Sequence, residues 1–427
     1  MTIKGTDNPN DTVESKIKTI QKVMDMAMLT QTGYTEITEF DPTNTFYKGI
    51  KAIIFEGLGI NGQKTKVFAY YSVPLFASPT NKVPAVVLLH GGGGHPFLEW
   101  IKMWNDRGYT AIAFDNTGFF PTAVNAGISE VNNDWVYGLD GFFNEPGFAN
   151  APNNDGVVTS NGAIENMWLF HAVGQTIFAN NILRSDIRVD SSKIGAVGIS
   201  WGGVVLSIAI GYDNRFAFAI PIYGSGYLDE SLAWIKNNFS MFSTRVIWSA
   251  SNNFGRVNMP ILWLCWNDDN CFSINSNSKS YLDTVENNPH TLLSIKHGMY
   301  HSHTMGWVQK ESMQFADSVV KDGVKLTSFV DQPTGTKISS LISVDPEAEV
   351  VSAQLYYITS AMTYSEHAKY HNTVSTYMDQ IWQTSPLEVE GKTVFGEVSP
   401  EAAGYYVEII AKINGELYIT TSVYTII

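Results

Sequence analysis

The apolar positions at the start of the chain change their spacing after about thirty residues. Over residues 11–29 they recur every three or four positions, which predicts an amphipathic helix with Asp11 and Glu14 as a capping box. Residues 47–73 instead form two β-rich runs on either side of Asn61-Gly62, a dipeptide typical of tight hairpin turns. The sequence therefore predicts an N-terminal helix followed by a β-hairpin.

Short, uninterrupted apolar runs come next and are separated by longer stretches with helical spacing. Apolar strands that alternate with helices are typical of a mostly parallel sheet that is covered on both faces. We therefore expect residues 1–325 to form a doubly wound α/β domain. Its predicted central strands are residues 84–89, 110–115, 193–199, 216–223, 260–266 and 291–296.

One segment of this domain, residues 116–163, does not follow the alternation and is rich in Gly, Asn, Pro and Phe. Long loops in compact domains often form lids or the walls of binding sites. The aromatic side chains of this insertion therefore either pack in the core or contact a substrate. They are Phe119, Phe120, Trp135, Tyr137, Phe142 and Phe143.

After about residue 325 the helical spacing mostly stops. Apolar and polar residues alternate with a period of two, and turn signals such as Asn414-Gly415 separate the runs. This pattern is typical of antiparallel strands with one buried face. The sequence predicts a small all-β sandwich domain over residues 326–427.

The composition agrees with two packed domains. Of the 427 residues, 44% are hydrophobic and 16% are charged, as in folded globular proteins. The net charge of −14 makes nucleic acid and anionic membranes unfavourable partners, since both are negatively charged. The two cysteines, Cys265 and Cys271, support neither a disulfide framework nor a four-ligand zinc site, so we expect reduced thiols.

The first ten residues lack the apolar core of a signal peptide, and no run is long enough to span a bilayer. The expected location is the cytoplasm, or outside the cell if a signal sequence has been removed.

The strongest chemical signal is the run Gly198-Ile-Ser200-Trp-Gly202. It follows a predicted strand and precedes a predicted helix, which is the setting in which a G-x-S-x-G serine is exposed above a sheet as a nucleophile. A turn serine without chemistry is the alternative.

A serine nucleophile needs a histidine base and a carboxylate that orients it, and in this setting the acid and the histidine follow the serine in that order. The predicted strand 260–266 ends at Asn267-Asp268-Asp269, and we expect Asp268 to be the acid, with Asp269 as the alternative. The last central strand is followed by His301 and His303. We expect His303 to be the base, because it leads directly into the final helix, with His301 as the alternative.

Two other features bear on the mechanism. The glycines after His90 can aim backbone N–H groups at a developing oxyanion, so Gly92, Gly93 and the N–H of Trp201 are the expected oxyanion hole. No Lys-Ser/Thr follows these glycines, which argues against a nucleotide-binding loop. The two late histidines lack the spacing of a zinc motif, so we expect neither a metal nor another cofactor.

Together the runs VVLLHGGGG, VGISWGGVV, DNRFAFAIPIYGSGY, LWLCWNDDNCF and MYHSHTMGW resemble the acetylxylan esterase and dienelactone hydrolase-like branch of the α/β-hydrolases. The likeness covers roughly residues 40–325, and the tail is similar to the β-sandwich that some members carry. The resemblance implies a triad of Ser200, Asp268 and His303. It also implies small acyl esters as substrates, among them acetyl groups on carbohydrate. Dienelactone hydrolases proper have cysteine where this chain has Ser200, which argues against their chemistry here.

The sequence thus predicts a serine esterase whose partner is a small-molecule or carbohydrate ester, with self-association into a homo-oligomer as a further possibility. Two alternatives stay open. One is a peptidase of the prolyl oligopeptidase type, although only about eighty residues precede the first central strand, too few for a propeller. The other is a hydrolase fold that has lost activity and serves as a binding module.

Overall fold

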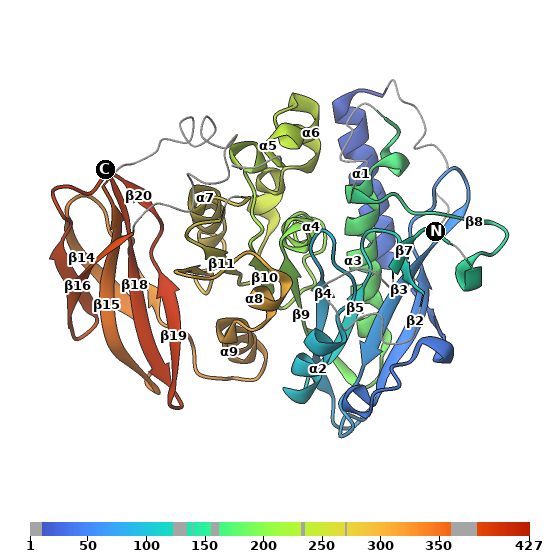
Figure 1. Cartoon of the computed structure of the whole chain (residues 1–427), viewed down its shortest axis with the longest axis horizontal. Coiled ribbons are helices and arrows are strands. Elements are labelled where there is room, and N and C mark those ends of the chain that lie inside the picture. The colour runs from blue at the N-terminus through green and yellow to red at the C-terminus, as the bar shows by residue number, and fades with distance from the viewer. Residues whose placement is uncertain are drawn as a thin grey trace. The chain divides into compact units, whose positions relative to one another are not determined.

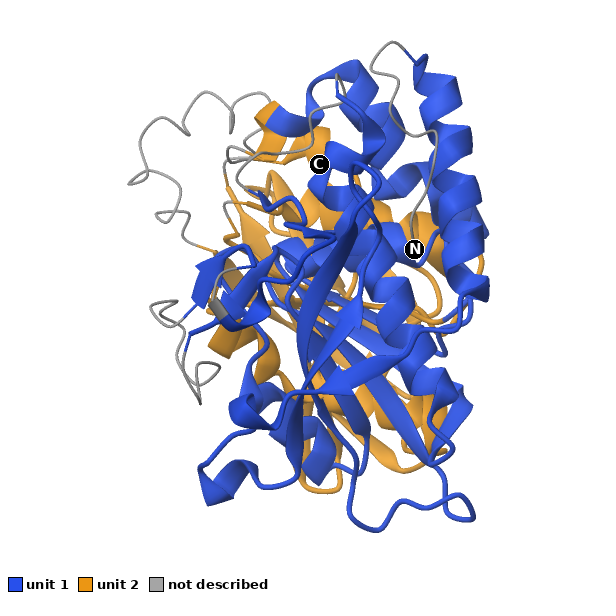
Figure 2. Ribbon diagram, turned by 90° about the vertical axis from the view of Figure 1, so that its right-hand side faces the viewer, with its two compact units in different colours: residues 1–224, 238–259 blue, residues 225–237, 260–427 orange. Residues whose placement is uncertain are grey.

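The computed structural model describes residues 11–122, 135–139, 141–154, 162–231, 235–269, 271–359 and 382–427. The chain divides into two compact units (Figure 2). Unit 1 comprises Met1–Gly224 and Asn238–Met259, and unit 2 comprises Ser225–Asn237 and Pro260–Ile427. Among the described residues, no helix is both long and apolar enough to cross a membrane.

Unit 1 is built around a mixed sheet with the strand order β1-β2-β3-β5-β4-β9-β10, and β8 pairs with β3 (Figure 1). The first strands are antiparallel, whereas β5, β4, β9 and β10 run parallel to one another. Two further strands, β6 and β7, form a separate pair. The strands are β1 (Tyr34–Glu36), β2 (Ile50–Glu56), β3 (Lys64–Ser72), β4 (Val83–Leu89), β5 (Thr110–Phe114), β6 (Phe119–Pro121), β7 (Trp135–Tyr137), β8 (Phe148–Ala149), β9 (Val189–Ile199) and β10 (Ala219–Ile222).

The predicted hairpin is confirmed. Strands β2 and β3 are joined through Asn61 and Gly62, which have φ values of +50° and +74°. Both residues are therefore left-handed, as a two-residue hairpin turn requires, and this explains why Asn and Gly stand there.

The helices of unit 1 are α1 (Val13–Leu29), α2 (Leu98–Asp106), α3 (Trp168–Ser185), α4 (Trp201–Ala209) and α6 (Phe242–Trp248), and α5 (Ile235–Phe239) spans the boundary of the units. The predicted first helix is present, but its cap differs from the expected capping box. The Thr12 hydroxyl accepts a hydrogen bond from the N–H of Ser15, so Thr12 caps the helix in place of Asp11. Helix α3 is buried along almost its whole length and packs against β9 and α4.

Unit 2 begins with two parallel strands, β11 (Leu262–Trp266) and β12 (Leu292–Lys296), which are connected by helix α7 (Ile274–Val285). Helices α8 (His303–Trp307) and α9 (Lys310–Val320) follow. All the central strands that the sequence predicted are present in one unit or the other. The sheet begins with antiparallel strands, β5 lies between β3 and β4, and the strands that follow are parallel. This is the arrangement of an α/β-hydrolase fold, as expected.

The rest of unit 2 is antiparallel, which confirms the prediction of a C-terminal all-β domain. Strand β16 pairs with β15 through its first half and with β17 through its second half. It thereby joins β14 and β17 to β15, β18 and β19 within one eight-stranded sheet. The strands are β13 (Ser328–Phe329), β14 (Lys337–Ser343), β15 (Ala348–Ile358), β16 (Gln383–Glu390), β17 (Thr393–Glu397), β18 (Gly404–Ile413), β19 (Glu416–Thr421) and β20 (Thr425–Ile426).

Within unit 2 the all-β domain is joined to the last strand of the α/β part by hydrogen bonds. The Ser294 hydroxyl donates to the carbonyl of Ile419, and the N–H of Ile295 donates to Thr421 Oγ1. Buried Glu311 accepts hydrogen bonds from Lys296 Nζ at 2.7 Å and from the N–H of Ile419 at 2.9 Å. The compact units therefore do not divide near residue 326, where the spacing of apolar residues changes from helical to alternating.

Beside this junction lies a buried acid, Glu408 on β18, which is only 3% exposed. Burial raises the pKa of its carboxyl from the ordinary 4.5 to about 7, Glu311 adds to the rise, and Lys296 opposes it. Because the folded-state pKa lies above the unfolded one, stability falls as the pH rises between these two values. The free energy of unfolding that is lost in this way amounts to about 3 kcal/mol at most, and Glu408→Gln should remove the loss.

We therefore expect the Glu408→Gln protein to melt close to the wild-type temperature at pH 4, below the unfolded pKa, and several degrees higher at pH 8. The exposed Glu388→Gln variant serves as a control that should leave both temperatures unchanged. Equal melting temperatures for Glu408→Gln and wild type at pH 8 would contradict the prediction.

Candidate active site

Ser200 lies between the end of β9 and the start of α4, at a turn with unusual backbone geometry. Its φ and ψ angles are +56° and −119°, a conformation that residues with a side chain rarely adopt. Its N–H donates to the carbonyl of Ile222 at 2.7 Å, and its own carbonyl accepts from the N–H of Val204 at 3.0 Å. The side chain remains partly exposed. The structure thus places this serine between a strand and a helix, as the G-x-S-x-G motif predicted, and in a strained turn.

The glycines on either side are needed because the backbone is crowded there. A Cβ on Gly198 would lie 2.2 Å from the carbonyl oxygen of Gly202, and a Cβ on Gly202 would lie 2.1 Å from that of Leu89. Both distances are far shorter than any real contact. Gly198 therefore lets β9 approach the start of α4, and Gly202 lets α4 approach the end of β4.

The glycine loop after β4 lies beside the residue that follows Ser200. The N–H of Gly94 donates to the carbonyl of Gly91 at 3.0 Å, and Gly93 has a φ of +67°, so residues 91–94 form a tight turn. A Cβ on Gly92 would lie 2.8 Å from Cδ1 of Trp201. The N–H of Trp201 belongs to the first turn of α4, where N–H groups point out of the helix. Unit 1 thus brings the loop and the helix start together.

Three buried side chains that we did not predict support this loop. The imidazole of His90 accepts from the N–H of Asn116 at 3.2 Å, and the Asn116 amide donates to the carbonyl of His90 at 3.0 Å. The indole of Trp168 donates to the carbonyl of Asn116 at 2.6 Å. Asn116 comes two residues after β5. Its place at the carboxyl end of a parallel strand, where ligands bind in α/β folds, could have identified it from the sequence.

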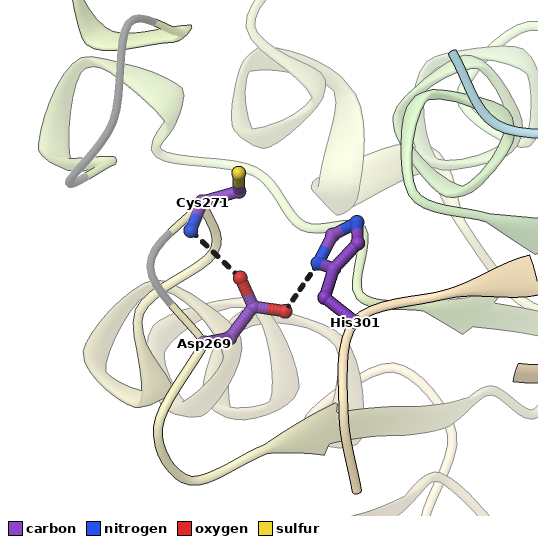
Figure 3. Close-up of side chains that lie close together, drawn as sticks. All are labelled: Asp269, Cys271 and His301. Carbon is purple, nitrogen blue, oxygen red and sulfur yellow. Dashed lines mark hydrogen bonds and ion pairs between the residues drawn. The ribbon is translucent and has the colours of Figure 1, made fainter. Parts of the chain in front are cut away.

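In unit 2, Asp269 and His301 form a hydrogen-bonded pair (Figure 3). Asp269 Oδ2 accepts from His301 Nδ1 at 2.7 Å, and Asp269 Oδ1 accepts from the N–H groups of Cys271 and Phe272 at 2.7 and 2.9 Å. The aspartate is buried, whereas the His301 side chain is 22% exposed and stacks on the Phe272 ring. Because the carboxylate only accepts, Nδ1 carries the proton and Nε2 carries the lone pair that a general base needs.

The pair that the sequence analysis preferred, Asp268 with His303, is not the pair that the structure shows. Asp268 Oδ1 instead accepts from the indole N–H of Trp382 at 2.9 Å, and burial raises the pKa of its carboxyl. His303 is the first residue of α8, whose N-cap Ser302 accepts from the N–H of Met305. The helix thus begins one residue earlier than expected. The loop before it contains His301, which meets the Asp269 carboxylate.

The ligand atoms of Asp269, Cys271 and His301 lie within 4.8 Å of one another, so a metal centre is the competing interpretation. Both Asp269 oxygens already accept hydrogen bonds from N–H donors, which a cation would have to displace. Burial, with a contribution from Asp269, raises the pKa of the Cys271 thiol to about 12, so it stays protonated at neutral pH and is a poor ligand. The arrangement fits an oriented histidine better than a metal centre.

The described aromatic residues of the insertion divide between core and surface. Phe120, Trp135 and Phe143 are buried, and the last two pack against Phe68 of β3. The exposed Phe142 lines a cavity of about 600 Å³ in unit 1, and Ser200 is not among the residues that line that cavity. Residues 123–134, 140 and 155–161 of the insertion lie outside the described part of the chain.

No protein-family model matches this sequence, and no curated protein matches it. Solved structures do resemble it. An acetyl xylan esterase from a Paenibacillus species has 17% identity and a TM-score of 0.49, over 71% of this chain and 95% of that one. Acetyl xylan esterase 1 from a Thermoanaerobacterium species has 16% identity and a TM-score of 0.48, over 71% and 94%.

A third structure, the acylaminoacyl peptidase of Pyrococcus horikoshii, has 16% identity and a TM-score of 0.44, and the match covers 64% of this chain and 42% of that one. Esterases and peptidases thus both occur among the similar structures. The assignment of an α/β-hydrolase fold with a C-terminal all-β domain rests on the strand order and on the turn at Ser200.

Proposed function

We propose that the protein is a serine esterase that hydrolyses short-chain acyl esters, acetyl esters in particular. In this proposal Ser200 is the nucleophile, His301 is the general base and Asp269 is the carboxylate that orients it. The observation that carries the proposal is the left-handed backbone of Ser200 at a partly exposed turn between β9 and α4. Such strain is seldom kept without a function, and this turn is the one that presents hydrolase nucleophiles.

The proposed reaction has two halves. Ser200 Oγ attacks the acyl carbon while its proton passes to Nε2 of His301, and the N–H of Trp201 with those of Gly92 and Gly93 would stabilise the oxyanion. The protonated imidazole then gives its proton to the departing alcohol, which leaves an acyl group on Ser200. A water molecule, activated by the same imidazole, releases the acid and restores the serine. Asp269 keeps Nδ1 protonated and stabilises the imidazolium in both halves.

The preference for small acyl groups is supported by the surroundings of the glycine loop. A Cβ on Gly92 would lie 2.8 Å from the Trp201 ring and 3.4 Å from the amide nitrogen of Asn154. Space is therefore restricted on the Trp201 side of Gly92, whereas a Cβ on Gly93 would meet nothing within 4 Å. Carbohydrate as the alcohol half of the ester is supported by the sequence resemblance alone.

The first test is kcat/KM for p-nitrophenyl acetate, butyrate and octanoate, measured beside a chromogenic Pro-containing peptide. We expect acetate to be hydrolysed at least 10-fold more efficiently than octanoate, because methylenes that a tight pocket cannot accept cost about 1–3 kcal/mol each. The peptide should not be cleaved. Equal kcat/KM values for the three esters would refute the short-chain specificity. Cleavage of the peptide alone would indicate a peptidase. If the folded protein turned over none of these substrates, a binding module would be indicated.

A second test concerns metal ions. Because the proposed triad supplies nucleophile, base and oxyanion donors, we expect EDTA or 1,10-phenanthroline to leave acetate hydrolysis unchanged. Activity that is lost on chelation and restored by zinc would assign Asp269, Cys271 and His301 to a metal centre.

A further inference from the structure

We infer that the all-β domain positions the acid of the proposed triad, because Trp382 at its edge holds Asp268, the residue next to Asp269. The inference rests on the proposed function. It gives a role to the C-terminal domain and to Asp268, neither of which takes part in the chemistry itself.

The turn after β11 presents two adjacent carboxylates to two different partners. Asp269 faces His301, whereas Asp268 Oδ1 accepts from Trp382 Nε1 at 2.9 Å. The N–H of Asp269 also donates to the carbonyl of Trp266 at 3.3 Å, which keeps the turn tight. With only one peptide bond between the two side chains, movement of Asp268 moves the backbone that carries Asp269.

Trp382 is itself held by the rings of the all-β domain. Its indole packs on Tyr406 with 5.2 Å between centroids and on Tyr424 with 6.1 Å. Tyr406 is fully buried and stacks on Tyr356 at 5.1 Å with an interplanar angle of 1°. We call Tyr356, Trp382, Tyr406 and Tyr424 the aromatic cluster. Because its members lock one another, the indole N–H has a fixed position.

The aromatic cluster holds the other end of the same turn as well. The Asn267 side-chain amide lies 3.1 Å from Nδ1 of His297, and the His297 ring lies 5.6 Å from the ring of Tyr356. The N–H of Asn267 donates to the carbonyl of Lys296 at 3.2 Å. The turn is thus anchored through Asn267 on one side and through Asp268 on the other, and both anchors lead to rings of the all-β domain.

The Asp268 contact matters because a carboxyl in this environment needs a donor. Burial raises its pKa, and the Trp382 hydrogen bond opposes that rise. A partly buried acceptor that loses its donor is destabilised, and reorientation of the side chain toward water relieves that destabilisation. Such a reorientation would turn the peptide that precedes Asp269 and loosen its contact with His301. A misplacement of about 1 Å at a catalytic group can lower the rate about 100-fold.

The test is Trp382→Phe, which keeps an aromatic ring in the cluster and removes the N–H donor. We expect kcat for p-nitrophenyl acetate to fall about 10- to 100-fold, while KM changes less than 2-fold. The downfield ¹H NMR signal of the His301 Nδ1 proton should shift or broaden, because it reports the hydrogen bond to Asp269. Tyr418→Phe is the control, since it also removes an aromatic donor of this domain, to Gln314, at a position that adjoins no member of the aromatic cluster in the chain, and it should change neither quantity.

Substitutions of Asp268 test the same bond from the other side and guard against misfolding of the Trp382 variant. Asp268→Asn keeps an oxygen that accepts from Trp382 and should retain nearly full kcat, whereas Asp268→Ala should match Trp382→Phe. The double variant Trp382→Phe/Asp268→Ala should be no slower than either single variant. Wild-type kcat in both Trp382→Phe and Asp268→Ala would overturn the inference. So would variants that change KM alone. A loss of kcat in Asp268→Asn equal to that in Asp268→Ala would also overturn it.

The NMR measurement separates this inference from the proposed function. If the wild-type protein hydrolyses no ester, the proposed function fails. A His301 signal that changes in Trp382→Phe but not in Tyr418→Phe would still support positioning. If the wild type is active and this signal is identical in all variants, the function stands and the positioning role is refuted.

Discussion

Replacing Ser200 with alanine is expected to abolish ester hydrolysis, with a loss in kcat on the order of 10⁶-fold. Without the hydroxyl there is no covalent acyl intermediate, and only the oxyanion donors and substrate binding continue to contribute. The side chain is partly exposed, and the φ of +56° is imposed by the backbone packing of Gly198 and Gly202. Alanine should therefore occupy the same turn, and the melting temperature should stay within a few degrees of the wild-type value.

The measurement combines steady-state hydrolysis of p-nitrophenyl acetate with labelling by a fluorophosphonate, which reacts only with activated serines. The wild-type protein should be labelled on the peptide that contains Ser200, and the Ser200→Ala protein should not be labelled. Wild-type turnover in a folded Ser200→Ala protein would assign the chemistry to another residue.

Asp269→Asn is expected to lower kcat on the order of 10⁴-fold. The Asn oxygen would be retained by the N–H groups of Cys271 and Phe272, so its NH₂ group would point at Nδ1 of His301. Two donors cannot face each other, and the imidazole must therefore move its proton to Nε2. In that tautomer the ring has no lone pair for the proton of the serine hydroxyl.

Asp268→Asn provides the comparison, because the two aspartates are neighbours and the substitution is identical. The Asn oxygen at position 268 can still accept from Trp382, so kcat should stay within a few-fold of the wild-type value. If the large loss occurred in Asp268→Asn and the small one in Asp269→Asn, the acid would be Asp268, as the sequence alone suggested.

The features that the sequence predicted correctly are those that depend on local spacing. The strand before Ser200, the two glycines around it and the helix after it are contiguous, and their packing follows from the sequence order. The Asn61-Gly62 turn and the alternating strands of the tail were likewise determined by neighbours in the chain.

The choices between Asp268 and Asp269, and between His301 and His303, could not be made in this way. The first depends on which carboxylate meets the N–H groups of Cys271 and Phe272, and this is set by the path of the turn. The second had a readable signal, since Ser302 is a good N-cap and places the following histidine inside a helix.

The contact between Trp382 and Asp268 joins residues 114 positions apart. No periodicity or motif encodes such a pairing, because it depends on how β15, β16 and β18 arrange the rings around Trp382. Long-range contacts of this kind are the part of the candidate site that the structure adds to the sequence.

The hydrogen bonds from Ser294 and Ile295 to β19 have a practical consequence for anyone who wishes to shorten or recombine this chain. The tail is not an interchangeable module that can be removed at residue 325. A protein that ended there would lose the partners of its last central strand and one of the two hydrogen-bond donors to Glu311. Libraries that exchange C-terminal domains among proteins of this fold should therefore transfer strands β11 and β12 together with the tail, so that the crossover falls near residue 260.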